Sequence, residues 1–386
     1  MAPFLSLNWS GNRPRVAAES LAATFDVDVL TSDWDHHRKT RQAPSAWSAI
    51  RDVIALNVPA YSKNVSLRRL LSHLVFGLRA ARWVRQRRGE YELVYVTAPL
   101  NLTACVVCLT LSDARRVLDI VDLWPDSLPF PTWLRILGAP LFAVWRHLRR
   151  LACRHADAIV TVSDSFLAEC GRFADGRPVT RIRLSHDAAV EDHEPAPEGE
   201  CDIAFVGNIG HLYDFETLLD AIQTAPGVRL QIVGDGDRRG WLVRECTARG
   251  LRYEYHGVIY EGETLARLLR RCRVGFNGYR RTSATISYKA GTYFSAGLPI
   301  LNSMGGDLAQ VVKEEGLGAN YRYGDAASLR EALEDILCVD RIVWSERCRS
   351  WFMREMETAR IRAQFRAVFE ASKPPGDSLR DETADG

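Results

Sequence analysis

The chain lacks any run of about 18 apolar residues, the length that a membrane-spanning helix needs, so no transmembrane segment is expected. The opening segment MAPFLSLNWSGNRPR has no basic residues ahead of its short apolar run, which argues against a secretory signal peptide. The nine cysteines lack metal-ligand spacing, and the CxxC formed by Cys105 and Cys108 has no partner pair. These absences predict a cytoplasmic protein with buried thiols and no bound metal.

Acidic residues are absent from two stretches of the N-terminal half, between Val53 and Gly89 and between Asp126 and Asp157. Both stretches contain arginines, and residues 66–86 and 140–155 within them have the periodicity of basic amphipathic helices. We interpret the apolar stripe of the first helix as its core-facing surface, and we expect the second helix to have an apolar face flanked by arginines. The first stripe comprises Leu67, Leu70, Leu71, Leu74 and Leu78. The second comprises Leu141, Val144, Trp145, Leu148 and Leu151, flanked by Arg146, Arg149 and Arg150.

Two interpretations of these basic helices stay open. They fit a peripheral protein that meets an anionic lipid surface, because each arginine near such a surface adds on the order of 1 kcal/mol. They equally fit the solvated faces of ordinary domain helices. Nucleic acid is not expected as a partner, since the arginines are not interleaved with exposed aromatic residues in a known module.

At 386 residues the chain can form two or three domains. Apolar strands alternate with helical segments in two successive sets, separated by an acidic, proline-bearing segment. The predicted fold is therefore α/β, with two Rossmann-like domains facing each other across a ligand cleft. The predicted boundaries are 1–187 for the N-terminal domain, 188–200 for the linker, 201–340 for the C-terminal domain, 341–371 for closing helices that can pack back on the N-terminal domain, and 372–386 for a disordered tail.

Three glycine-bearing loops are predicted at the carboxyl ends of strands, where ligands bind in open parallel sheets. Gly11 lies in the first, after a predicted strand at Phe4 to Trp9. The second is GNIGHLYD (207–214), in which Asn208 or His211 either faces a ligand or caps the next helix. The third is GDGDRRG (234–240), where Gly234 and Gly236 would let the backbone approach a phosphate and Arg238 or Arg239 could add positive charge. Its spacing does not match the dinucleotide-binding fingerprint.

The stretch TISYKAGTYFSAGLPILN (285–302) predicts a short helix from about Tyr288, followed by a turn and a buried strand. Lys289 and Thr292 then lie near the N-terminus of that helix. Free backbone N–H groups and the positive end of the helix dipole favour anionic oxygens there. The alternative is an ordinary helix–strand joint.

The segment DIVDLWPDS (119–127) places Asp119, Asp122 and Asp126 at a strand end and in the loop after it, beside Trp124. A partly buried carboxylate in that position can take a proton from a hydroxyl, so Asp122 is the candidate general base. The alternative is that one aspartate caps a helix or pairs with an arginine.

These motifs resemble those of the bacterial family 4 glycosyltransferases, which are retaining, sugar-nucleotide-dependent enzymes of the GT-B fold. DIVDLWPDS is similar to a loop of the first domain, and SYKAGTYFSAGLPILNSMGGDLAQVV to the donor-binding segment. AFVGNIGHLYDFETLLDAI and LQIVGDGDRR look like the first two strand–loop–helix units of the C-terminal domain. YSKNVSLRRLLSH is similar to a segment of capsule and exopolysaccharide members.

The resemblance implies an N-terminal acceptor domain, a C-terminal nucleotide-sugar domain and metal-independent hexosyl transfer with retention of configuration. The implied donor is a UDP- or GDP-sugar, a co-substrate rather than a cofactor, and the implied acceptor is a lipid-linked saccharide for surface polysaccharide. Lys289 would contact the donor diphosphate, Gly11 would approach the donor, and Asp122 would belong to the catalytic region. The enzyme would then work in the cytoplasm, peripherally at the inner face of the cell membrane.

Two departures from the family pattern support an alternative. Thr292 stands where the family has the glutamate that binds the donor ribose, and Asn208 and His211 stand where the first C-terminal loop usually has Arg and Lys. A threonine can hydrogen-bond a ribose hydroxyl but brings no charge. The chain could therefore be a catalytically degenerate homologue that binds a nucleotide or a partner. A weaker alternative is another two-Rossmann enzyme, such as a sugar-nucleotide epimerase.

Overall fold

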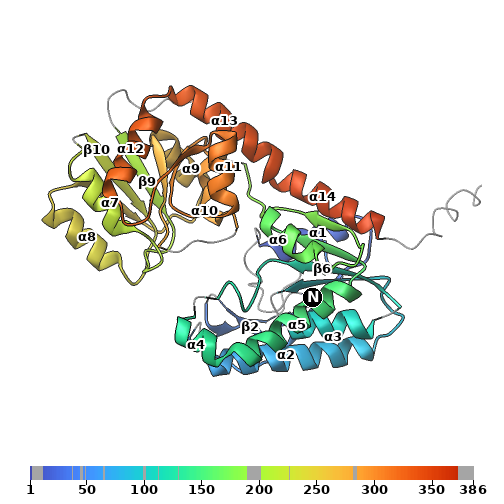
Figure 1. Cartoon of the computed structure of the whole chain (residues 1–386). Helices are drawn as coiled ribbons and strands as arrows, with labels where there is room; N and C mark the ends of the chain where they lie inside the picture. Colours follow the sequence, from blue (N-terminus) through green and yellow to red (C-terminus); the bar gives the residue numbers. More distant parts are fainter. Residues whose placement is uncertain are drawn as a thin grey trace, which may run out of the picture. The chain divides into compact units, whose positions relative to one another are not determined.

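The computed structural model of the chain describes residues 1, 12–36, 38–43, 47, 49–63, 66–98, 101–111, 113–128, 130–188, 201–225, 227–280 and 285–372. The chain divides into two compact units (Figure 1). Unit 1 comprises Met1–Arg183 together with Ile361–Gly386, and unit 2 comprises Leu184–Arg360. The segment Phe4 to Trp9, predicted to be the first strand, and Gly11 lie outside the described residues.

Unit 1 contains a four-stranded parallel sheet in the order β5-β6-β7-β8, a parallel pair β1–β4 and an antiparallel pair β2–β3. The strands are β1 (Asp28–Ser32), β2 (Trp34–Asp35), β3 (Thr40–Arg41), β4 (Asp52–Leu56), β5 (Leu93–Ala98), β6 (Arg115–Ile120), β7 (Ala158–Thr161) and β8 (Val179–Arg181). Parallel strands covered by helices on both faces read as near-continuous apolar runs, which is why β5 to β7 could be predicted. The short β2–β3 pair carries no such signal and was not predicted; β4 was not predicted either, although Val53 to Leu56 form a short apolar run.

Helices α1, α2 and α6 of unit 1 begin at polar caps. The side chain of Asn12 accepts a hydrogen bond from the backbone N–H of Arg15 at 2.9 Å, and Ser66 accepts one from Arg69 at 3.2 Å. The helices are α1 (Arg13–Leu21), α2 (Leu67–Arg85), α3 (Asn101–Thr110), α4 (Thr132–Leu137), α5 (Ala139–His155) and α6 (Asp164–Gly171). The final helix, α14 (Thr358–Ala371), places Ile361, Phe365 and Phe369 in the core of this unit.

The interpretation of the leucine stripe on α2 as a core-facing surface is wrong. Its five leucines are between 43% and 85% exposed. The buried face comprises Ser72, His73, Phe76, Gly77, Ala80, Ala81 and Val84. A Cβ atom at Gly77 would lie 2.9 Å from Oγ1 of Thr103 on α3, so this glycine lets the two helices pack closely. Because this face packs on the rest of unit 1, the leucines lie toward solvent.

Helix α5 differs from the prediction in the same way. Leu141 and Val144 are each 57% exposed, whereas Arg149, expected on the flank, is buried. Helix α4, which was not predicted, has no buried residue, and Trp133, Ile136 and Leu137 on it are 62–74% exposed. Across the described part of the chain, no helix combines the length and apolarity needed to cross a bilayer.

Unit 2 contains a six-stranded parallel sheet in the order β11-β10-β9-β12-β13-β14. Counted from β9, this is the 3-2-1-4-5-6 order of the Rossmann fold, and the order reverses between β9 and β12. The strands are β9 (Cys201–Val206), β10 (Val228–Val233), β11 (Arg252–Gly257), β12 (Val274–Asn277), β13 (Ile300–Asn302) and β14 (Gly318–Asn320). The helices are α7 (Phe215–Ile222), α8 (Arg239–Ala248), α9 (Gly262–Arg271), α10 (Tyr288–Ser295), α11 (Asp307–Glu315), α12 (Ala326–Leu337) and α13 (Arg341–Glu355). Both units are thus Rossmann-like.

The segment predicted as closing helices, 341–371, divides between the two units. Helix α13 belongs to unit 2, where Trp344 joins one core cluster and Cys348, Trp351 and Phe352 join another. Most of α14 belongs to unit 1, where Phe365 and Phe369 meet the Tyr95 ring edge-on, with centroids 6.0 and 5.8 Å away.

Candidate functional site

The carboxyl edge of the unit 2 sheet carries two glycine loops that pack against each other. Gly207 follows β9 with a φ of 129°, and Gly234 follows β10 with a φ of 130°, both in the region that favours glycine. A Cβ atom at Gly234 would overlap the carbonyl oxygen of Gly207. The backbone N–H of Ile209 donates to the carbonyl of Asp235 at 2.8 Å. These glycines therefore have a packing role at the switch point of the sheet, in addition to the predicted approach to a phosphate.

The other predicted residues of these loops differ in exposure. Asn208 and His211 are exposed, so both are accessible at this edge. Gly236 is half-buried, and a Cβ atom there would overlap Oδ1 of Asn208 and the backbone of Ile209. The loop geometry thus leaves Asn208 and His211 available to a ligand.

Arg238, predicted to supply positive charge, is buried and already paired. Its Nη2 donates to Glu216 at 2.6 Å, and its guanidinium carbon lies 3.6 Å from the centre of the Trp241 ring. Arg280 binds the same carboxylate. Partial burial opposes ionisation of Glu216, but hydrogen bonds from Arg238 and Arg280 outweigh it and lower the pKa of Glu216 to about 2. Glu216 therefore balances part of the positive charge at this edge.

Lys289 lies in the first turn of α10, whose N-terminus is capped by Ser287 accepting from the backbone N–H of Ala290 at 3.2 Å. The lysine side chain is buried. Its Nζ lies 3.7 Å from the centre of the Phe205 ring and 3.3 Å from that of Tyr213. Burial lowers the pKa of Lys289 well below its usual value. The helix start is where the sequence predicts it, but the ammonium lies among aromatic rings.

Thr292 faces a different neighbourhood from Lys289. Together with Tyr288 of the same helix, it lines a cavity of about 310 Å³ whose other walls come from α9 and from the segment around His186. The His186 and Tyr288 rings lie 3.9 Å apart. A hydroxyl here can hydrogen-bond a polar ligand, and Asp187 and Glu263 line the same cavity.

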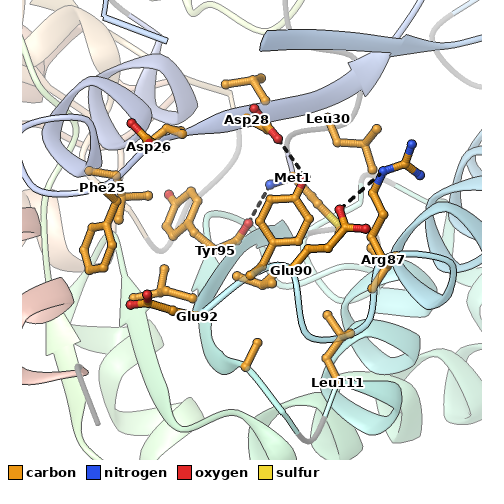
Figure 2. A pocket seen from close by; sticks show the side chains of 18 of the residues that line it. Met1, Phe25, Asp26, Asp28, Leu30, Arg87, Glu90, Glu92, Tyr95 and Leu111 are labelled. Atoms are coloured by element: carbon orange, nitrogen blue, oxygen red, sulfur yellow. Dashed lines mark hydrogen bonds and ion pairs between the residues drawn. The ribbon is translucent and has the colours of Figure 1, made fainter. Parts of the chain in front are cut away.

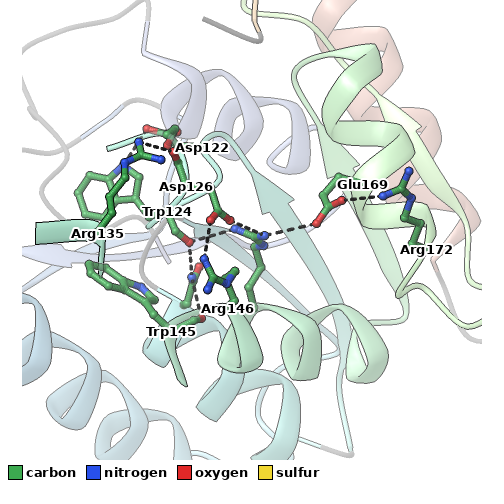
Figure 3. Close-up of polar contacts among 11 residues, drawn as sticks. Asp122, Trp124, Asp126, Arg135, Trp145, Arg146, Glu169 and Arg172 are labelled. Atoms are coloured by element: carbon green, nitrogen blue, oxygen red, sulfur yellow. Dashed lines mark hydrogen bonds and ion pairs between the residues drawn. The ribbon is translucent and has the colours of Figure 1, made fainter. Parts of the chain in front are cut away.

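The three aspartates of the 119–127 segment have three separate sets of partners. Asp122 accepts a hydrogen bond from Nε1 of Trp124 at 2.8 Å and another from the Ser127 hydroxyl (Figure 3). Asp126 pairs with Arg146 at 3.0 Å. Asp122 is thus held in place by its own loop and is half-buried, and its role as a general base stays a prediction.

Arg149 was missed by the sequence analysis, which placed it on the solvated flank of α5. Its guanidinium donates to the Trp124 carbonyl and to Asp126, each at 3.1 Å, and pairs with Glu169 at 3.5 Å (Figure 3). The side chain is 4% exposed. Arg149 therefore fixes the loop that carries Asp122. Helical periodicity alone gave no signal that distinguished it from Arg146 and Arg150.

Arg13 and Asp119 form a second feature that the sequence analysis did not assign. The arginine guanidinium donates to Asp119 and also to the carbonyls of Ile182 and Arg183 at 2.8 and 2.9 Å. The Tyr95 hydroxyl binds the same carboxylate. The sequence did contain a signal for this contact. Asp119 lies inside an apolar strand, and a buried carboxylate there requires a buried hydrogen-bond donor.

A cavity of about 590 Å³ lies in unit 1 and is bounded by the first residues of β1 and β5 (Figure 2). In it the α-amino group of Met1 donates to the Tyr95 carbonyl at 2.5 Å, and the Tyr91 hydroxyl donates to Asp28 at 2.7 Å. Asp28 and Leu93 begin these strands, so the cavity lies at their amino ends. Ligands of open parallel sheets bind at the opposite edge, and we assign no substrate to it. Within the described ranges, no cluster of three or more His, Cys, Asp or Glu residues could hold a metal ion.

Comparison with known families agrees with this arrangement. The model of the glycosyl transferase 4-like domain matches residues 11–185, and the model of glycosyl transferases group 1 matches residues 200–339. The chain is therefore a group 1, family 4-like glycosyltransferase of the GT-B fold, a class of enzyme that transfers a sugar from a nucleotide donor. The sequence prediction of the family and the fold is confirmed.

The probable glycosyltransferase WbjE of Pseudomonas aeruginosa is 23% identical over 321 residues, covering 78% of this chain and 79% of WbjE. Among solved structures, sucrose-phosphate synthase from Thermosynechococcus elongatus has a TM-score of 0.68 at 17% identity, covering 93% of this chain and 92% of its own. HepE of Anabaena, solved in complex with UDP, has a TM-score of 0.66 at 14% identity, covering 96% of this chain and 99% of its own.

Proposed function

We propose that this protein transfers a hexose from a UDP- or GDP-sugar to a lipid-linked saccharide in surface polysaccharide biosynthesis. The observation that carries the proposal is the carboxyl edge of unit 2, where the loops at Gly207 and Gly234 adjoin the capped N-terminus of α10. HepE structures containing UDP and UDP-glucose share this fold, which favours a uridine nucleotide among the donors. The similarity to the probable glycosyltransferase WbjE supports sugar transfer, and WaaG, a glycosyltransferase involved in lipopolysaccharide biosynthesis, shares the fold.

In the proposed reaction the bond between the anomeric carbon of the sugar and the diphosphate oxygen breaks, and the nucleoside diphosphate leaves with the bonding electrons. The acceptor hydroxyl oxygen bonds to the anomeric carbon with retained configuration, and the hydroxyl proton passes to Asp122. The positive end of the α10 dipole stabilises the leaving diphosphate without a metal. Lys289, Asn208 and His211 add polar contacts, and Thr292 binds a donor hydroxyl.

We further propose that unit 1 binds an anionic membrane surface through α2, α4 and α5. Eight apolar side chains of α2 and α4 are exposed together with Leu141 and Val144 of α5. Helices α2 and α5 have no acidic residue, and their arginines flank the apolar side chains. Apolar residues flanked by cations are what an anionic lipid interface accommodates. A lipid-linked acceptor is presented at such an interface, so the enzyme would work peripherally at the cytoplasmic face of the cell membrane.

The proposal is tested by measuring the thermal unfolding of the protein with UDP, GDP, UDP-glucose and a range of other UDP- and GDP-sugars. A nucleotide at 100 times its Kd stabilises the folded protein by about 2.7 kcal/mol, which raises Tm measurably. We expect the nucleotide and sugar that raise Tm most to support transfer to a lipid-linked saccharide. Unchanged Tm with every nucleotide would contradict the proposed function.

A second candidate function is nucleotide or partner binding without turnover. The observation that favours it is Thr292, which places a neutral hydroxyl where the family has a carboxylate. Under this alternative UDP raises Tm, but no sugar is transferred to any lipid-linked acceptor. Thr292→Glu separates the two: a gain in turnover means that the threonine weakens a working enzyme, whereas no turnover in either form supports the binding protein.

A further inference from the structure

Lys289 is surrounded by aromatic rings and glycine. Phe205 at the end of β9 and Tyr213 in the loop before α7 lie closest to Nζ, and Tyr279 after β12 lies 5.8 Å away. A Cβ atom at Gly207 would lie 2.9 Å from Cε of Lys289 and 3.6 Å from its Nζ. Four segments of unit 2 therefore enclose the end of this side chain.

The enclosure offers the amine no hydrogen-bond partner among the described residues. The titratable groups that face it are the phenols of Tyr213 and Tyr279, and burial raises the pKa of both, so both stay neutral. The charged groups beside these tyrosines have other partners: Arg280 binds Glu216, and Asp214 accepts from Thr217 at 2.7 Å.

A buried amine without a partner destabilises the fold, because burial costs its hydration and nothing replaces it. Methionine would fill the same space among the rings without that cost. Packing therefore does not explain a lysine at position 289. A lysine at position 289 is explained if its amine can occupy a second location. The side chain can reach such a location by moving past Gly207, which has no side chain to obstruct the lysine methylenes.

We propose that Lys289 is a stored cation: without donor its amine rests among Phe205, Tyr213 and Tyr279, and a nucleoside diphosphate draws it past Gly207 onto a phosphate oxygen. This inference rests on the proposed function, since it concerns the same donor site. In the stored position burial lowers the pKa of the Lys289 amine, whereas contact with a phosphate oxygen favours the charged ammonium. Binding of the diphosphate therefore favours proton uptake from solution.

Proton uptake is measured by titrating the protein with UDP at pH 8 in two buffers that differ in ionisation enthalpy. At that pH the phosphates of UDP are already ionised, since the second pKa of such a group is about 6, so they contribute no uptake. We expect UDP binding to be accompanied by net proton uptake. Lys289→Met should abolish the uptake, and Lys313→Met, a matched change of an exposed lysine on α11, should leave it intact.

A measurement without nucleotide tests the same inference independently. Because methionine fits the stored position without losing hydration, Lys289→Met should raise Tm of the nucleotide-free protein, while Lys313→Met should not. UDP binding without proton uptake, or a fall in Tm for Lys289→Met, would contradict the proposal that Lys289 is a stored cation. Neither result would contradict the proposed donor site. Failure of UDP and GDP to bind at all overturns the proposed function, and the stored cation with it.

Discussion

Arg13 and Asp119 form a two-pronged ion pair, with Nε to Oδ2 at 2.7 Å and Nη2 to Oδ1 at 2.9 Å, and both side chains are almost fully buried. Breaking a buried pair by removing one partner leaves an uncompensated charge. We therefore expect Asp119→Ala to lower the free energy of unfolding by about 3–5 kcal/mol. Chemical denaturation measures this loss.

The matched control is an exposed pair on unit 2. Arg354 and Glu315 are 2.8 Å apart and each is more than 40% exposed. Exposed pairs contribute about 0–1 kcal/mol, so Glu315→Ala should change stability by no more than that. Equal losses in the two variants would show that burial does not set the strength of the Arg13–Asp119 pair.

Asp122 and Asp126 lie on one loop but should respond differently to loss of charge. Asp122→Asn keeps an oxygen that can accept from Trp124 but cannot take a proton. We expect kcat for sugar transfer to fall by about 10²- to 10⁴-fold with unfolding unchanged. Asp126→Asn weakens the pairing with Arg146 and Arg149, so it should lower stability and spare kcat. Comparable kcat in all three proteins would remove Asp122 from the catalytic role.

The exposed leucines of α2 should govern lipid binding. Leu71→Glu and Leu74→Glu place a carboxylate on the proposed lipid-facing surface, so both should reduce sedimentation with vesicles containing phosphatidylglycerol. High salt should weaken binding of the parent protein in part, because it screens the arginines but not the apolar contacts. Ile342→Glu changes an apolar position on α13 of unit 2 that is more exposed than either leucine, and it serves as the control. Vesicle binding that is unaffected by the leucine changes would exclude α2 from the surface.

Two buried histidines should make the protein sensitive to mild acid. Burial, with Arg69 and His36 nearby, lowers the pKa of His73 to about 3, and burial lowers that of His186 to about 4. In the unfolded chain both titrate near 6.5, so below that pH the unfolded state binds more protons. Stability should then fall from pH 6.5 towards about 4, by up to about 1.4 kcal/mol per pH unit for each histidine.

His73→Phe tests the contribution of unit 1, since a phenyl ring can keep the stacking on Trp124, whose ring centroid lies 5.8 Å away. The free energy of unfolding of this variant should depend less steeply on pH between 6.5 and 4. An unchanged slope would mean that His73 is accessible to protons in the folded protein.

Gly207 and Lys289 should be coupled. Gly207→Ala meets strain from its positive φ and crowds Cε of the lysine, so we expect a loss of about 1–3 kcal/mol. Lys289→Ala removes the crowding between the lysine Cε and the new methyl group at position 207, but it does not relieve the backbone strain at position 207. Gly207→Ala combined with Lys289→Ala should therefore lose less than the two single changes added together. Denaturant unfolding of the four proteins measures the difference, and strict additivity would mean that the two residues do not touch.

The sheet of unit 2 was the most predictable part of the fold. Its strands are buried on both faces, so β9 and β10 stand out as short apolar runs, each closed by a glycine loop. The faces of α2 could not be predicted, because periodicity identifies an apolar stripe but not the side on which a neighbouring helix lies. In this case the contact between Gly77 and Thr103 shows that α3 packs on the glycine face of α2, away from the leucines.

The position of Lys289 at a helix start was readable from sequence, but its surroundings were not. Phe205, Tyr213 and Tyr279 come from three separate segments, and only the folded sheet brings them together. Likewise, Arg238 was read as available charge because its partner Glu216 lies on a different helix. Local patterns specified where the site lies, while long-range packing decides which of its charges are available.

Helix α14 gives the protein an uncommon order of assembly during synthesis. Phe365 and Phe369 complete the core of unit 1, yet the ribosome makes them after every residue of unit 2. N-terminal domains generally fold first as a chain emerges. Here the apolar core of the N-terminal unit stays incomplete until α14 is synthesised, whereas residues 184–360 can complete their own core earlier. The newly made chain is therefore most in need of chaperone protection at its beginning, until its end arrives.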